Sequence, residues 1–269
     1  MQIFFNLAES TLELGFIYGI MAVGVYITYK ILDFPDLSVD GTFPLGACVT
    51  AMLILGGVNP WLACLAAFLC GLAAGCVTGL LHVKLGITDL LSGIIVMTGL
   101  MTVNLVVLQG AGVKAFYDQP TIFNSGPIAM LPEAVYRHRV VLAALVMVLV
   151  VKLLMDWFLK TKTGLLLRAT GDNQQYVTSL AQDQGRMKIL GLAIGNGCTA
   201  LAGSVYAQQA ESASTSSGTG MVVIALTCVI IGTNLFRPIR IMRATTMAVL
   251  GAVLYQACLN IAKSEAKRS

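Results

Sequence analysis

Three aspartates, Asp33, Asp36 and Asp40, lie within eight residues in a chain that has only 13 acidic residues out of 269. Carboxylates clustered in this way could bind Mg²⁺ in a lipid-phosphate transferase or share a proton in an intramembrane aspartyl protease. The first chemistry is not supported, because the TFPLGACV that follows Gly41 lacks the arginine and later carboxylates of the CDP-alcohol transferase signature. The second needs a facing aspartate deep in a helix, and the remaining candidates stand at predicted span ends.

The other residue types that support catalysis are sparse. His82 and His138 fall in separate predicted loops on opposite sides of the membrane, and the seven cysteines lie in apolar runs without a C-x2-C pair. Neither a metal site nor an activated nucleophile is easily built from them. We therefore expect no catalytic residue, metal or cofactor, and a protein that is not an enzyme.

Composition identifies an integral membrane protein. Hydrophobic residues make up 57% of the chain and charged residues 11%, too few charges to cover a soluble domain of this length. The net charge of +4 comes from basic residues in short loops, without the patch that nucleic acid would need. Because the first apolar run has no basic residue before it, residues 1–30 do not resemble a cleavable signal peptide.

A span requires about 20 apolar residues. The predicted spans are 11–29, 60–80, 89–108, 139–158, 188–209, 219–236 and 243–262. Residues 43–55 are apolar but short, and are expected to form a tilted or half helix. The predicted fold is an all-α polytopic membrane bundle of about seven to nine transmembrane or re-entrant helices, forming a single transmembrane domain over residues 1–269.

Basic residues set the expected topology. The polar segment 159–188 is rich in Lys and Arg, so the positive-inside rule places it in the cytoplasm. The 110–138 segment and the N-terminus then lie outside, and the aspartate cluster lies inside. The basic C-terminal residues also fall outside, against the rule; either residues 210–262 contain a re-entrant segment or one further span is missing.

Polar and small residues within the spans have two interpretations. Asn104, Asn196 and Gln208 either line a passage for a small polar solute or bond to neighbouring helices. Glycines spaced four apart, at 71, 75 and 79 and at 191 and 195, predict close helix packing.

The segment from Thr163 to Gln208, beginning TGLLLRATGDNQQYVTSLAQDQG, resembles the cytoplasmic coupling region of permease subunits in the branched-chain amino-acid-type ABC importer family. Members read G-x3-RA-x-G-(D/E)-(N/D) there. The matching positions are Gly164, Arg168, Ala169, Gly171, Asp172 and Asn173. The stretches at 33–47 and 83–105 fit a subgroup of these permeases in which some members are linked to tryptophan or other aromatic amino acids.

The resemblance implies a multi-pass bacterial cell-membrane permease that transports a small polar solute, possibly an aromatic amino acid. Its implied partners are cytoplasmic ABC ATPase subunits, an external solute-binding protein and a second permease copy. In the family, a short helix of the coupling segment fits a groove on the ATPase, and we expect this helix to start at Gly171–Asn173. The chain has no G-x4-GK-[ST] loop, so ATP hydrolysis requires a separate subunit. The alternative function is a stand-alone secondary transporter or channel.

With this topology, Asp36, Asp40 and Gly41 form a predicted re-entry and capping motif. Asp40 or Thr42 is expected to cap a half helix starting near Pro44, a residue suited to a first helical turn. The alternative is a role in gating the inner mouth or contacting the ATPase.

Overall fold

The computed structural model describes residues 2–125, 138–172, 183–239 and 242–266, and the chain is almost entirely helical there. The helices are α1 (Gln2–Val25), its π-helical extension η1 (Tyr26–Ile31), α2 (Val39–Leu55), α3 (Pro60–Leu85), α4 (Asp89–Val107), α6 (Arg139–Phe158), α7 (Lys162–Asp172), α9 (Gln184–Ala210), the 3-10 turn η3 (Thr215–Gly218), α10 (Met221–Leu235) and α11 (Ala244–Ala266). The strands are β1 (Val113–Ala115) and β2 (Ser212–Ser214). The predicted all-α membrane fold is confirmed.

Within the described residues, seven helical segments are long and apolar enough to cross a membrane. They are Leu7–Ile31, Pro60–Leu85, Asp89–Val107, Arg139–Phe158, Gln184–Ala210, Thr215–Leu235 and Ala244–Lys263. Each overlaps a predicted span. The eighth apolar helix, α2, is shorter, as predicted, but it begins at Val39 rather than near Pro44, which lies inside it.

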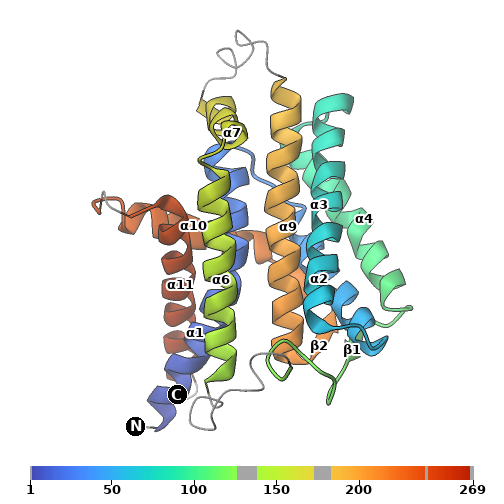
Figure 1. The fold of residues 1–269 in the computed structure, drawn as a ribbon, viewed down its shortest axis with the longest axis vertical. Coiled ribbons are helices and arrows are strands. Elements are labelled where there is room, and N and C mark those ends of the chain that lie inside the picture. The colour runs from blue at the N-terminus through green and yellow to red at the C-terminus, as the bar shows by residue number, and fades with distance from the viewer. Residues whose placement is uncertain (1, 126–137, 173–182, 240–241, 267–269) are drawn as a thin grey trace.

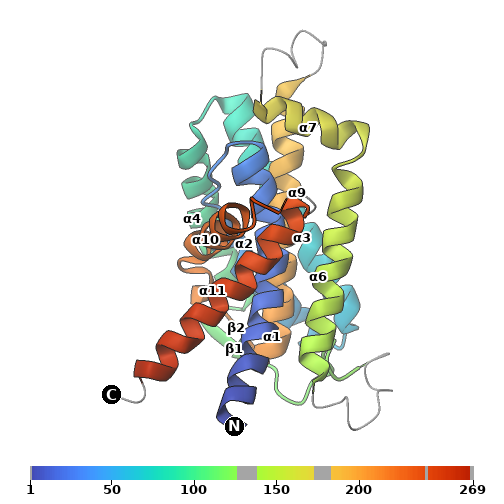
Figure 2. The same ribbon diagram turned by 90° about the vertical axis from the view of Figure 1, so that its left-hand side faces the viewer.

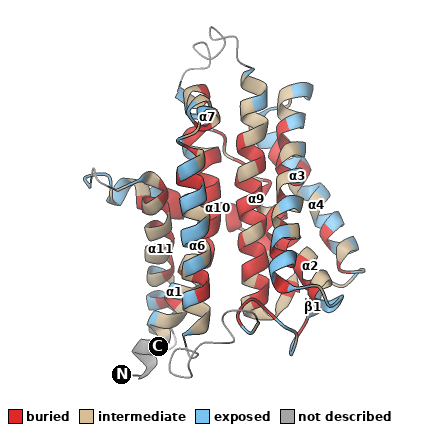
Figure 3. Cartoon of the chain, in the orientation of Figure 1, coloured by how far each residue is buried: buried red, intermediate tan, exposed pale blue. Residues whose placement is uncertain are grey.

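Helix α9 occupies the centre of the bundle and packs most extensively against α3 and α2 (Figure 1). Its middle is almost continuously buried, whereas α4 and α6 present exposed faces (Figure 3). The exposed side chains on α6 are mainly Leu and Val, such as Leu153 and Leu154. Apolar faces of this kind are suited to contact with lipid or with another membrane helix.

Glycines permit the close packing of α9. A Cβ added at Gly75 would lie 2.3 Å from the carbonyl oxygen of Leu192, and one at Gly71 would lie 2.5 Å from that of Asn196. At Gly79 the added atom would lie 2.7 Å from the Cα of Ile189. The predicted glycine stripe on α3 is therefore confirmed as a packing surface against α9.

The two chain ends lie at the end of the bundle opposite α7 (Figure 2), which agrees with the topology predicted from the basic residues. Helix α10 is seen nearly end-on in Figure 2, so it lies across the bundle while α1, α6 and α9 run along it. Sequence analysis left open a re-entrant segment within residues 210–262, and α10 is the helix of that region that runs across the bundle.

At the end of the bundle opposite α7, β1 pairs antiparallel with β2, with Lys114 opposite Ala213. This pairing attaches the first part of the predicted 110–138 loop to the chain that leaves α9; residues 126–137 of that loop lie outside the described residues.

Candidate functional site

A buried polar junction forms where α2 starts beside the middle of α9. The Asp36 carboxylate accepts hydrogen bonds from the Ser38 backbone N–H at 2.8 Å and its hydroxyl at 2.6 Å. Its other oxygen accepts from the Asn196 amide at 2.6 Å. The Asn196 oxygen accepts from the Thr42 hydroxyl at 2.7 Å. Asp36 is 6% exposed and the other three residues are fully buried, so the junction is sealed from solvent.

Local backbone geometry brings Asp36 into this junction. The π-helix η1 ends with bonds from the Leu32 N–H to the Ile27 carbonyl and from the Phe34 N–H to the Thr28 carbonyl. These bonds stop the first span and turn the chain back, so that Asp36 faces α9. The predicted chain reversal at this position is present.

The start of α2 also touches the backbone of α9 directly. A Cβ added at Gly46 would lie 1.9 Å from the Ala200 carbonyl oxygen, and one at Gly203 would lie 2.0 Å from that of Phe43. The two helices therefore meet backbone to backbone, with glycine on both sides.

Asp40 caps a different helix from the one predicted. Its carboxylate accepts hydrogen bonds from the backbone N–H groups of Gly220 at 3.1 Å and Val222 at 2.7 Å, at the start of α10. The expected cap on its own helix is wrong, because α2 begins one residue before Asp40 and its N-cap residue, Ser38, makes no side-chain capping bond. Asp40 thus joins the starts of α2 and α10, and its charge complements the α10 helix dipole.

Gly41 and Asn104 form a second contact of the re-entry motif. The Asn104 amide on α4 donates to the Gly41 carbonyl at 3.1 Å, and a Cβ added at Gly41 would lie 2.9 Å from the Leu100 side chain. The side-chain oxygen of Asn104 has no hydrogen-bond partner among the described residues, although it is buried.

Gln208 attaches the segment after β1 to α9. Its side-chain oxygen accepts from the Ile122 N–H at 2.9 Å, and its amide donates to the Cys64 sulfur at 3.1 Å. Each of the three predicted pathway amides, Asn104, Asn196 and Gln208, thus bonds to a neighbouring segment and is 0–1% exposed. This was the alternative left open by the sequence; their role in a pathway stays a prediction.

At the opposite end of the bundle, five of the six residues of the predicted coupling motif, Gly164 to Asp172, lie on α7. A Cβ added at Gly164 would lie 2.3 Å from the Phe158 carbonyl oxygen, and one at Gly171 would overlap that of Ile31. Both glycines are needed for α7 to rest against the ends of α6 and η1. Arg168 and Asp172 are exposed, and Ala169 is partly buried.

Gly171 and Asp172 are the last residues of α7, so a new helix does not start at Gly171 itself; the predicted cap by Asp172 or Asn173 on a following helix stays a prediction. Asn173 and the predicted amphipathic helix that follows it lie outside the described residues.

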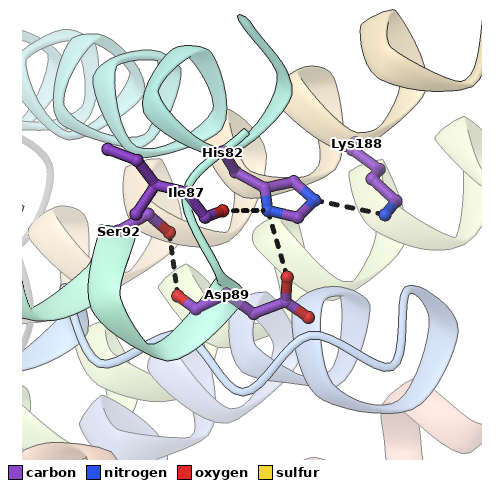
Figure 4. Close-up of polar contacts among 5 residues, drawn as sticks. All are labelled: His82, Ile87, Asp89, Ser92 and Lys188. Carbon is purple, nitrogen blue, oxygen red and sulfur yellow. Dashed lines mark hydrogen bonds and ion pairs between the residues drawn. The ribbon is translucent and has the colours of Figure 1, made fainter. Parts of the chain in front are cut away.

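His82 connects the turn between α3 and α4 to the start of α9 (Figure 4). Its Nδ1 lies 2.9 Å from the Ile87 carbonyl oxygen and 3.0 Å from an Asp89 carboxylate oxygen, while Nε2 lies 3.2 Å from the Lys188 ammonium. An ammonium group has no acceptor, so Nε2 accepts and Nδ1 carries the hydrogen. An open groove of about 600 Å³ lies beside this histidine, lined by Pro35, His82, Gly86, Ile87, Thr88, Asp89 and Leu90.

An ion cluster ties α6 to the start of α11. The Asp156 carboxylate contacts Arg243 at 2.8 Å and Lys152 at 3.3 Å, and it accepts from the Thr245 hydroxyl at 2.5 Å. No pairing of Asp156 was predicted from the sequence; Arg243, just before α11, and Thr245, in its first turn, are 87 and 89 residues away from it. Among the described residues, no three His, Cys, Asp or Glu side chains gather as a metal ion would need.

The buried polar groups join neighbouring helices of an apolar bundle, and α7 lies at one end of that bundle. Comparison with known proteins identifies its relatives. The tyrosine transport system permease protein of Clostridioides difficile is 41% identical over 95% of this chain and 82% of its own length. The autoinducer 2 import system permease protein LsrC of Salmonella typhimurium is 28% identical over 83% of this chain and 60% of its own.

Among solved structures, PsaBC from Streptococcus pneumoniae in complex with Fab aligns over 91% of this chain and 88% of that chain, with a TM-score of 0.45 and 15% identity. The model of the family described as branched-chain amino acid transport system / permease component matches residues 7–266. The chain, a multi-pass protein of the bacterial cell membrane, therefore belongs to this family of ABC importer permeases.

Proposed function

We propose that residues 1–269 act as one permease domain that carries an amino acid, in the aromatic class, through the membrane in an ATP-driven importer. The observation that carries this proposal is the 41% identity, over nearly the whole chain, to a protein named as a tyrosine transport permease. A stand-alone secondary transporter is less well supported, because coupling to an ion needs carboxylates free to bind it. Asp40 is held by backbone N–H groups and Asp156 by Lys152 and Arg243, so neither is free to bind a transported ion.

We propose that separate ATPase subunits dock on α7 and the residues that follow it, within segment 159–188. Gly164 and Gly171 allow α7 to pack directly against the ends of α6 and η1. A movement of α7 would therefore be transmitted to these spans without a flexible linker. Its outer side displays Arg168 and Asp172 together with Leu165, which is 57% exposed. An exposed leucine flanked by both charge signs is suited to a protein partner.

The remaining proposed partners are an external solute-binding protein and a second permease copy. The solute-binding protein would dock at the end of the bundle that carries the β1–β2 pair. The exposed apolar faces of α4 and α6 are available to the second copy and to the bilayer.

Reversing the exposed charge of Asp172 tests the docking assignment. Asp172→Arg is expected to reduce copurification of the ATPase subunit at least about tenfold, the effect of about 1.4 kcal/mol of lost interface energy. The variant should still fold, since Asp172 is exposed at the end of α7. The control is Lys114→Glu, a charge reversal at the opposite end of the bundle. Full ATPase recovery with Asp172→Arg would contradict the assignment.

The substrate class is tested on the solute-binding partner and on uptake. Tyrosine, tryptophan and phenylalanine are expected to bind that partner more tightly than branched-chain amino acids, and uptake into proteoliposomes should require ATP and the ATPase. Uptake driven by an ion gradient without ATP would favour the secondary transporter.

A further inference from the structure

The Asp36 carboxyl is a buried acid whose partners are all neutral. It lies in the connection between the first span and α2, and its three hydrogen bonds come from a backbone N–H, a hydroxyl and an amide. It forms no ion pair in the part of the chain that the structure describes, unlike Asp156, which contacts both Lys152 and Arg243. A buried charge without a counter-ion is costly, and such a group usually becomes neutral instead.

Burial raises the pKa of Asp36, and the hydrogen bonds from Ser38 and Asn196 offset only part of that rise. The groups facing the carboxyl are Ser38 from the start of α2 and Asn196 from α9, and neither titrates in the physiological range. Among the described residues, no charged side chain acts on its pKa. The rise in the pKa of Asp36 therefore comes from burial in the junction itself.

The geometry also provides a place for the proton. The Ser38 oxygen lies 2.6 Å from an Asp36 oxygen and 3.1 Å from the Asn196 side-chain oxygen. When Asp36 is ionised, the Ser38 hydroxyl donates to it. When Asp36 is protonated, its own O–H donates to Ser38, whose hydroxyl rotates and donates to Asn196. Every hydrogen-bonding group stays paired in both states.

Asp40 provides the contrast. Its oxygens accept from backbone N–H groups at the start of α10, and no hydroxyl of the described residues is recorded as donating to them. Backbone N–H groups at a helix start stabilise the charged form. Asp36 and Asp40 thus differ in their partners: a hydroxyl contacts Asp36, whereas two backbone N–H groups of another helix contact Asp40.

We propose that Asp36 is a proton-binding site, neutral at pH 7 while α2 and α9 are packed together. If α2 separates from α9, water reaches the carboxyl, its O–H bond breaks and the proton passes to water. When the helices close again, the carboxyl takes up one proton. Opening of this junction is therefore linked to release of a proton, and acidification favours the closed junction. This inference does not depend on the substrate or on ATPase docking.

Infrared difference spectroscopy of the full chain tests this protonation state directly. The spectrum of the wild type minus that of Asp36→Asn, at about pH 7, is expected to show the C=O stretch of one carboxylic acid, shifted in D₂O. The matched variant Asp40→Asn should instead remove carboxylate bands. Loss of carboxylate bands in Asp36→Asn, with no carboxylic-acid band, would overturn the proposal.

If the Asp36→Asn variant cannot be produced, the infrared test can be made on wild-type protein whose aspartate carboxyl groups carry ¹³C. A protonated aspartate band at about pH 7 supports the proposal, and its absence overturns it.

The same proton predicts a pH dependence of stability. In the unfolded chain Asp36 ionises above about pH 4, whereas in the folded chain it keeps its proton to higher pH. The folded state then binds more protons, so this group makes the protein less stable as pH rises above about 4. Between that pH and the folded pKa, the unfolding constant of the wild type should rise about tenfold per pH unit relative to Asp36→Asn. Chemical unfolding of both proteins in detergent measures the difference, and parallel pH profiles would contradict it.

Discussion

Gly46→Ala is expected to prevent the permease from reaching its folded, monodisperse state. The added Cβ would lie 1.9 Å from the Ala200 carbonyl oxygen and 2.8 Å from the Ala200 Cα, so α2 and α9 would have to move apart. Overpacking of a core typically costs about 1–3 kcal/mol, and here the obstacle is backbone and cannot rotate away. We expect a loss at the upper end of that range or beyond. Size-exclusion chromatography and thermal unfolding in detergent measure it.

Gly99→Ala is the matched control. Gly99 lies in the middle of α4, is exposed, and has no atom within 4 Å of an added Cβ. Alanine favours a helix over glycine by about 1 kcal/mol, so this variant should be neutral or slightly stabilised. If both variants unfold alike, the close contact between α2 and α9 does not determine stability.

Asp40→Ala is expected to impair both assembly and transport. It leaves the N–H groups of Gly220 and Val222 without their acceptor. Loss of a helix cap costs about 0.5–2 kcal/mol, and each buried polar group left unpaired costs about 1–3 kcal/mol. Asp40→Asn keeps one acceptor oxygen and should give an intermediate loss. Thermal unfolding and uptake into proteoliposomes report the two effects.

Two comparisons sharpen the interpretation of Asp40→Ala. Asp33 lies seven residues before Asp40, and its carboxylate is exposed. Its backbone φ is 52°, a conformation that asparagine tolerates, so Asp33→Asn should behave as wild type. Addition of a metal chelator should change nothing in the wild type. If the chelator reproduced the loss caused by Asp40→Ala, the cluster would be a metal site after all.

Apolar run length was enough to predict the spans, because lipid imposes a length of about 20 residues on any helix that crosses it. The start of α2 was misplaced because Pro44 is favoured in the first turn of a helix. Pro44 instead lies within α2 and has no N–H, so the Asp40 carbonyl oxygen receives no helical hydrogen bond from it. Gly218 packs against this oxygen, since a Cβ added there would lie 1.9 Å from it.

The partners of the aspartates could not be predicted from the sequence. Asp36 and Asn196 were both identified as notable residues, but their contact spans 160 residues. The local pattern contains no information about which buried amide meets which carboxyl. Of the two residues that complete the junction, Ser38 has no role in the sequence-based prediction, and Thr42 is predicted only as a helix cap, not as a partner of Asn196. The π-helix that turns Asp36 toward α9 has no distinctive sequence signal either.

The long separation of these partners sets an order of events during synthesis. Asp36 and Asp40 leave the ribosome 160 and 182 residues before Asn196 and Val222, which bind them. At about 5–20 residues per second, the start of α2 waits roughly 10–40 s for its partners. During that interval the newly made α2 carries two carboxyl groups without their final hydrogen bonds, so it can settle at its final depth in the bilayer only when α9 and α10 arrive.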